Sequence, residues 1–244
     1  MRWLDQVLAV PSVGIQIVPN FSTASRYVSA AATLVDEVLE KDHEIIFDAK
    51  SPFDFAIRTK AGIGAKISAT ELVADFSYSV LPKPEAGNLP SFIQVTRRPY
   101  TSILDEVVGR LTHVFGTIAK FGAIKIRLFG IVATTRMESG SIPPGLEALT
   151  RHLGKPWQSP LVMAKSTLLA NLDERDDATD RCHHTIAFDV TKEPKETHFV
   201  LDWQRVLREP AVLDADGVRV AFENCRAAAL SYFDRVGEGA LNFD

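Results

Sequence analysis

The pattern that most constrains the fold is an alternating strand followed by a helix, and it occurs twice. Val13, Ile15 and Ile17 alternate with small or polar residues, which is typical of a strand with one buried face. The same alternation returns 111 residues later, over residues 124–128. A chain that repeats this order is expected to contain two copies of one folding unit.

The elements that follow each alternating strand are also arranged alike. The first strand, at 12–18, precedes a helix over 23–41, short strands near 53–57, 66–69, 74–80 and 92–96, and a helix over 102–120 that Ser102 caps. The second strand, at 123–134, precedes a short helix near 143–153, strands near 160–170, 181–191 and 197–204, and a final helix that Asp216 caps.

Runs of strands separated by helices predict an α+β fold. We expect duplicated β-α-β(3-4)-α units that form one curved, mostly antiparallel sheet with helices packed on one face. The two units are residues 1–122 and 123–244. Each unit alone would have a long exposed sheet edge and a thin core, so we expect the two to form one interlocked domain.

This order of elements resembles the duplicated plan of the TATA-binding-protein-like fold. Three short segments are similar to a sporadically distributed, uncharacterised family of bacterial proteins of about this length: Tyr100-Thr101-Ser102, Ile126-Arg127-Leu128-Phe129-Gly130 and Leu241-Asn242-Phe243. The resemblance to that family implies no catalytic residue. The chain lacks the paired intercalating phenylalanines of TATA-binding proteins, so the resemblance does not imply DNA bending.

Hydropathy and cysteine content bear on the compartment. No apolar run reaches the ~18 residues that a membrane span needs, and the N-terminus lacks the apolar stretch of a signal peptide. We therefore expect a cytoplasmic protein without a membrane partner. Cys182 and Cys225 are the two cysteines of the chain, and this number does not predict a disulfide framework.

Charge is unevenly distributed along the chain. Residues 97–170 carry 10 basic and 4 acidic side chains, whereas residues 171–244 carry 9 basic and 16 acidic ones. A basic middle next to an acidic end predicts either two binding surfaces or two complementary regions that meet each other. The sequence leaves both interpretations open.

The densest group of potential metal ligands is Cys182-His183-His184. Along a strand, Cys182 and His184 point to one side and His183 to the other, and the first two share their side with apolar residues. A zinc site needs about four ligands, and the sequence has no CxxC or HxxxH motif to supply them. We predict that Cys182 and His184 pack in the core, and we expect no metal site.

No motif predicts a catalytic nucleophile or a cofactor. There is no GxSxG elbow, and Gly62 and Gly64 lack the following Lys and Ser or Thr of a phosphate-binding loop. The acidic residues between 173 and 180 lack the glycine and bidentate glutamate of a calcium loop. We therefore interpret the glycines as a hairpin turn and the acidic run as a solvated hairpin tip, and expect no catalytic residue and no cofactor.

The face of the sheet that the helices do not cover is the candidate working surface. An antiparallel sheet can leave one face in water, and mixed charges with a few aromatics are typical of an interaction surface. A face that is merely solvated would show the same pattern. The candidate binding residues on this face are Gln16, Arg58, Lys125, Arg127, Phe129, Arg181, His183 and His198.

Three hypotheses of function follow. The favoured one is a non-enzymatic binding or scaffold subunit that docks a protein partner, or a second copy of itself, through the polar sheet face. The first alternative is nucleic-acid binding through the basic segment 97–170, with phosphate contacts from Arg97, Arg98, Lys125, Arg127, Arg136, Arg151, Lys155 and Lys165. The second alternative is an enzyme or small-ligand binder with a site between sheet and helices, formed by Asp75, Arg127, His183 and His198.

Overall fold

The computed structural model describes residues 2–18, 24–41, 46–51, 54–59, 61–78, 82–83, 91–92, 97–138, 142–148, 163–189 and 196–240. Its helical elements are η1 (Trp3–Asp5), α1 (Ala24–Lys41), α2 (Tyr100–Ala119) and α4 (Ala215–Glu238), and residues 144–148 are also helical. Its strands are β1 (Ala9–Ile17), β2 (Ile46–Ser51), β3 (Asp54–Arg58), β4 (Ile63–Ser68), β5 (Glu71–Phe76), β6 (Pro82–Lys83), β7 (Ser91–Phe92), β8 (Lys125–Glu138), β9 (Met163–Glu174), β10 (Ala178–Asp189) and β11 (Glu196–Val212).

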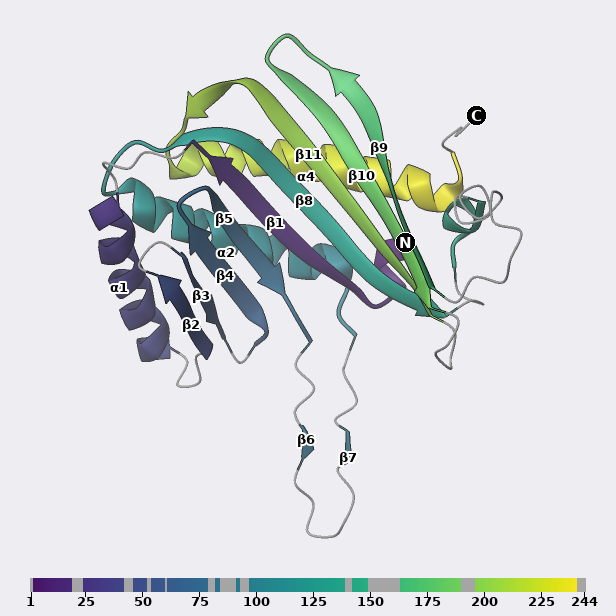
Figure 1. Cartoon of the computed structure of the whole chain (residues 1–244), viewed down its shortest axis with the longest axis horizontal. Helices are drawn as coiled ribbons and strands as arrows, with labels where there is room; N and C mark the ends of the chain where they lie inside the picture. Colours follow the sequence, from purple (N-terminus) through teal and green to yellow (C-terminus); the bar gives the residue numbers. More distant parts are fainter. Residues whose placement is uncertain are drawn as a thin grey trace.

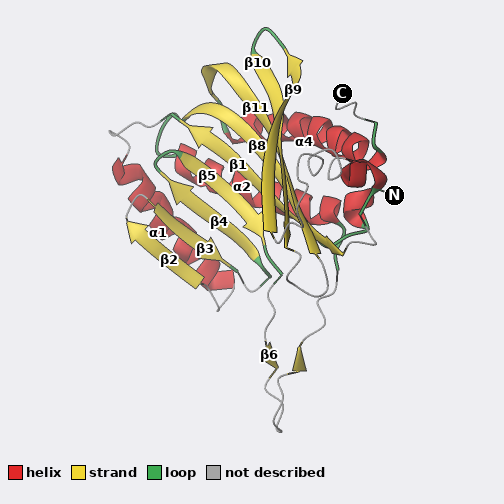
Figure 2. Cartoon of the chain, turned by 45° about the vertical axis from the view of Figure 1, so that its right-hand side comes forward, coloured by secondary structure: helices red, strands yellow, loops and turns green. Residues whose placement is uncertain are grey.

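Nine strands form one antiparallel sheet in the order β2-β3-β4-β5-β1-β8-β11-β10-β9, and β6 pairs with β7 separately. The two alternating strands of the sequence, β1 and β8, lie side by side near the middle of the sheet (Figure 1). The helices α1, α2 and α4 all lie on one side of the sheet (Figure 2). The predicted α+β fold, with an antiparallel sheet and helices on one face, is confirmed. The division into duplicated units stays a prediction.

Helix starts differ from the prediction in both long helices. The α2 helix begins at Tyr100 rather than Ser102, and the carboxylate of Asp5 accepts hydrogen bonds from the Thr101 backbone N–H (3.0 Å) and hydroxyl (3.2 Å). Asp214, in extended conformation, caps α4 by accepting a 2.7 Å bond from the Gly217 N–H. Asp216, the predicted cap, lies two residues further along, in the first turn of the helix. A neighbouring element therefore caps one helix, which local spacing in the sequence does not reveal.

The core lies between the sheet and its helices. Val13, Ile15 and Ile17 of β1 are buried against this side, as their alternation predicts. On β8, Phe129 is 2 % exposed and meets the ring of Phe222 from α4 edge to face, with 5.3 Å between ring centroids. These contacts fix which face of the sheet is covered.

The prediction that Phe129 lies on the open face is wrong, because β8 contains an extra residue. Gln16 of β1 pairs with Leu128, but the next residue, Ile17, pairs with Ile126. Arg127 is left over as a bulge. Side-chain alternation therefore changes phase at this point, and a strand that buries Ile126 before the bulge buries Phe129 after it.

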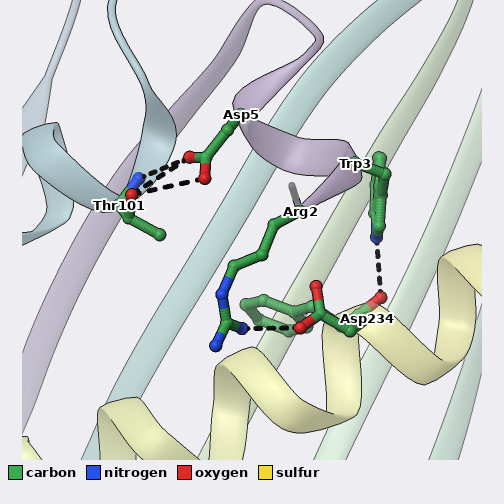
Figure 3. Close-up of polar contacts among 6 residues, drawn as sticks. Arg2, Trp3, Asp5, Thr101 and Asp234 are labelled. Carbon is green, nitrogen blue, oxygen red and sulfur yellow. Dashed lines mark hydrogen bonds and ion pairs between the residues drawn. The ribbon is translucent and has the colours of Figure 1, made fainter.

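The N-terminal segment makes hydrogen bonds with both α2 and α4 and an ion pair with α4 (Figure 3). Arg2 pairs with Asp234 of α4 at 2.7 Å, and the indole N–H of Trp3 donates a 2.8 Å hydrogen bond to the Phe233 carbonyl. A Cβ on Gly237 would lie 2.3 Å from Cδ1 of Trp3. The glycine is thus required for the indole to lie against α4 at this position.

Two polar pairs are buried on the helix side of the sheet. Asp180 is 3 % exposed, and both its oxygens accept 2.7 Å hydrogen bonds from Arg205, its partner in the ladder between β10 and β11. His184 is 1 % exposed and lies 2.8 Å from the hydroxyl of Tyr232. The prediction of a solvated acidic tip therefore holds for residues 173–177, which are exposed, and is wrong for Asp180.

Within the part of the chain that the structure describes, no helix combines the length and the apolar character needed to span a bilayer.

Candidate functional site

The face of the sheet opposite the helices, termed the open face, carries a row of side chains that crosses eight strands. The ladder pairs align successive positions from β3 to β9. One row consists of Arg58, Gly64, Asp75, Ser12, Val132, Asp202, His183 and Leu169. Residues two positions away along each strand form the adjacent rows on the same face.

A hollow of about 340 Å³ lies at the centre of the open face. Its floor contains Gly14 of β1 and Gly130 of β8, which are direct partners in the ladder. A Cβ on Gly130 would have no atom nearer than 3.8 Å, so packing within the chain does not require glycine there. The pair of glycines leaves bare backbone at the middle of the sheet, with room for atoms of a binding partner. The hollow is lined by Ser12, Gly14, Ile15, Gln16, Glu71, Val73, Leu128, Gly130, Val132, Arg181, Asp202 and Gln204.

One wall of the hollow is a polar chain on β10 and β11. Arg181 donates from Nε to Oε1 of Gln204 at 2.9 Å, and Nε2 of Gln204 donates to Oδ2 of Asp202 at 2.8 Å. Burial raises the pKa of the Asp202 carboxyl, while its bond to Gln204 and the nearby His183 and Arg181 act in the opposite direction. Arg181 lines the hollow, and within the described residues its hydrogen bond is made by Nε, which leaves its terminal nitrogens available as donors.

The far side of the open face, on β3 to β5, has charges that are already paired. Arg58 donates from Nη2 to both oxygens of Asp75 at 2.8 Å, and from Nη1 to Ser77 and to the Gly62 carbonyl. Lys66 pairs with Glu71 at 2.9 Å, which raises the pKa of that lysine. The ion pairs on β3 to β5 therefore hold these side chains in place and balance their charges, whereas the terminal nitrogens of Arg181 remain available as hydrogen-bond donors.

The structure places five of the eight predicted binding residues on the open face, but not all at the hollow. Gln16 and Arg181 line the hollow, and Arg58, His183 and His198 lie on the surrounding strands. Lys125 and Arg127 are exposed at the beginning of β8, outside the residues that line the hollow. Phe129 is buried on the other side.

Ten of the twelve residues that line the hollow were not among the predicted binding residues, and Gly130, Asp202 and Gln204 are three of these ten. Gly130 interrupts the alternating strand in the sequence, which is the signal that could have identified it. Asp202 and Gln204 follow His198 at steps of two, so strand periodicity places them on its face. The bond between Gln204 and Arg181 could not be predicted, because it depends on the register between β10 and β11.

The geometry gives less support to the two alternatives, an enzyme or ligand site between sheet and helices and a nucleic-acid interface. Asp75, His183 and His198 lie on the open face, so a site formed by them between sheet and helices is wrong. Among the predicted phosphate contacts, Arg97 donates to the Gln6 carbonyl and Arg98 pairs with Glu106. Lys125, Arg127, Arg136 and Lys165 are exposed, whereas Arg151 and Lys155 lie outside the described residues.

A larger groove, of about 670 Å³, runs between α2 and α4 on the outer side of the helices. Its rim charges pair with one another: Asp105 with Arg226 at 2.7 Å, and Arg219 with Glu223 at 2.6 Å. These ion pairs, together with that of His113 and Glu37, engage the charged side chains that line the groove other than Lys120. Volume alone does not make it the better candidate.

The described residues contain no group of three or more His, Cys, Asp or Glu side chains placed to hold a metal ion. Burial raises the pKa of the Cys182 thiol and raises that of Cys225 to about 12, so both thiols stay protonated and unreactive.

Comparisons of the chain with protein-family models, with curated proteins and with solved structures give no match.

Proposed function

We propose that this protein is a binding or scaffold subunit, and that a protein partner docks on its open sheet face around the Gly14–Gly130 hollow. The observation that carries the proposal is the pair of facing glycines. A strand interior loses stability when it carries glycine, and here neither packing nor a positive φ requires one. A surface that receives atoms from a partner accounts for both positions.

The chemistry of the wall suits a polypeptide. Arg181 supplies donors and Asp202 supplies an acceptor within one hydrogen-bonded chain, and a peptide group has both an acceptor and a donor to match them. Val73, Leu128 and Val132 add apolar contact area beside these groups. Apolar contacts surrounded by satisfied polar groups are typical of protein interfaces.

A protein partner is favoured over a nucleic acid because of what the open face lacks. The open-face positions on the described strands carry no Phe, Tyr or Trp side chain on which bases could stack, and their aromatic rings are the imidazoles of His183 and His198. Arg58 and Lys66 are also neutralised by Asp75 and Glu71. A groove that follows a phosphate backbone needs unpaired positive charge along its length.

Matched substitutions on the two sides of the molecule test the proposal. Val132→Arg places a long cation at the centre of the open face, and Val220→Arg makes the same change on α4, where Val220 is 47 % exposed. Wild type and both variants are immobilised, and bound proteins from native cell lysate are quantified by mass spectrometry. We expect Val132→Arg to reduce capture at least tenfold and Val220→Arg to leave it unchanged.

Equal capture by the two variants, with both folded by circular dichroism, would place the docking surface elsewhere. Retained nuclease-sensitive nucleic acid, lost in Val132→Arg, would favour the nucleic-acid hypothesis instead.

A further inference from the structure

The sheet ends at β9, a long edge strand. It spans Met163–Glu174, 12 residues, and within the described chain it pairs with β10 alone. The opposite edge strand, β2, has 6 residues. The outward-facing N–H and C=O groups of an edge strand are free to pair with another strand. The β9 edge therefore has about twice the pairing length of the other edge.

This edge lacks most of the features that prevent strand pairing. Proteins protect edge strands with proline, inward charges, bulges or short length. β9 has no proline, and Lys165 is its single charged residue before Asp173. Its register is regular from Met163 to Asn171 and shifts only beyond that point. Leu169 is 54 % exposed, an apolar side chain at the centre of an accessible strand.

Charge along β9 favours one direction of pairing. Lys165 lies near the start of the strand, and residues 173–177 at its end carry four acidic side chains and one arginine. Asp173 and Glu174 keep 52 % and 76 % of their side chains exposed despite their ion pairs with Arg175 and Arg208. Antiparallel pairing of two copies brings each Lys165 toward the acidic end of its partner, whereas parallel pairing aligns like charges.

We propose that two copies of this chain associate through β9, in an antiparallel ladder about a twofold axis through Leu169. In that register Leu169 faces its own copy, and Thr167 faces Asn171 of the second chain. The two nine-stranded sheets become one continuous sheet, with both open faces on the same side. This association is a property of the edge and does not depend on the function proposed for the open face.

A cysteine at the twofold axis tests the register directly. Partners in an antiparallel ladder have Cα atoms about 4.5–5.5 Å apart, which is within disulfide range. Under mild oxidation, we expect Leu169→Cys to give a disulfide-linked dimer. Val220→Cys on α4 is the matched exposed control and should remain monomeric on a non-reducing gel. Cys182 and Cys225 are buried and do not compete.

Charge reversal tests the direction of pairing in the protein without added cysteines. By light scattering after size exclusion, we expect a wild-type dimer that Lys165→Glu weakens at least tenfold. Adding Glu174→Lys to that variant should restore the dimer, because the new glutamate of each chain then lies toward the new lysine of the other chain. A wild-type protein that stays monomeric at every concentration overturns the proposal, as does equal cross-linking at positions 169 and 220. Capture of a partner by such a monomer would leave the open-face function standing.

Discussion

Replacing Asp180 with alanine is expected to lower the free energy of unfolding by about 3–5 kcal/mol. The carboxylate is 3 % exposed and accepts two 2.7 Å hydrogen bonds from Arg205, whose side chain is 12 % exposed. Bonding to Asp180 raises the pKa of Arg205, and without that partner the guanidinium still stays charged, because arginine is not deprotonated in proteins. The loss would arise chiefly from that isolated buried charge, and urea unfolding followed by circular dichroism measures it.

Two controls separate this effect from a general loss of acidic charge. Glu174→Ala removes an exposed carboxylate from the same hairpin and should change stability by less than about 1 kcal/mol. The double variant Asp180→Leu/Arg205→Met removes both charges and should recover most of the lost stability. An Asp180→Ala variant as stable as Glu174→Ala would contradict this account of the buried pair.

Acid is expected to destabilise the fold through His184. Burial lowers the pKa of this histidine from 6.5 to about 4, so the folded protein holds the neutral ring beside the Tyr232 hydroxyl. Between pH 6.5 and 4 the unfolded chain binds a proton that the folded one does not, so stability falls as pH falls through this window. The difference amounts to about 3 kcal/mol at the acid end of the window, measured as urea midpoints at several pH values.

His184→Gln is the comparison that isolates this titration. Glutamine keeps hydrogen-bonding capacity near Tyr232 and cannot gain a proton, so its stability should fall less steeply between pH 6.5 and 4. The pKa of Asp202 and that of Asp234 are both raised by burial, and these carboxyls favour the fold on acidification. Because both proteins retain them, their effect cancels in the difference. Parallel pH profiles would show that His184 titrates freely in the fold.

The parts of the fold that follow from periodicity could be predicted from the sequence. Alternation at Val13, Ile15 and Ile17 predicted the buried face of β1, and the order of strands and helices predicted that helices cover it. The bulge at Arg127 was not predictable, because one extra residue in a strand changes neither composition nor propensity. That single residue accounts for the wrong placement of Phe129.

Polar contacts between segments that are distant in the sequence could not be predicted either. Asp180 belongs to a run of similar acidic residues, and its burial follows from the ladder that sets it opposite Arg205. The cap that Asp5 gives to α2 joins residues 96 positions apart. At the candidate site, alternation predicted Gln16, Arg181 and His183 on the open face, whereas the hollow depends on two glycines becoming neighbours through the pairing of β1 with β8.

Filling the hollow while preserving the fold tests the central claim most directly. Gly130→Val adds a side chain where a Cβ has ordinary contact distances, and valine suits a strand better than glycine, so we expect an unchanged or higher melting temperature. Gly109→Ala on the outer side of α2, where a Cβ meets no atom within 4 Å, is the control. We predict that partner capture falls at least tenfold with Gly130→Val alone; full capture by that variant, with the fold intact, would contradict docking at the hollow.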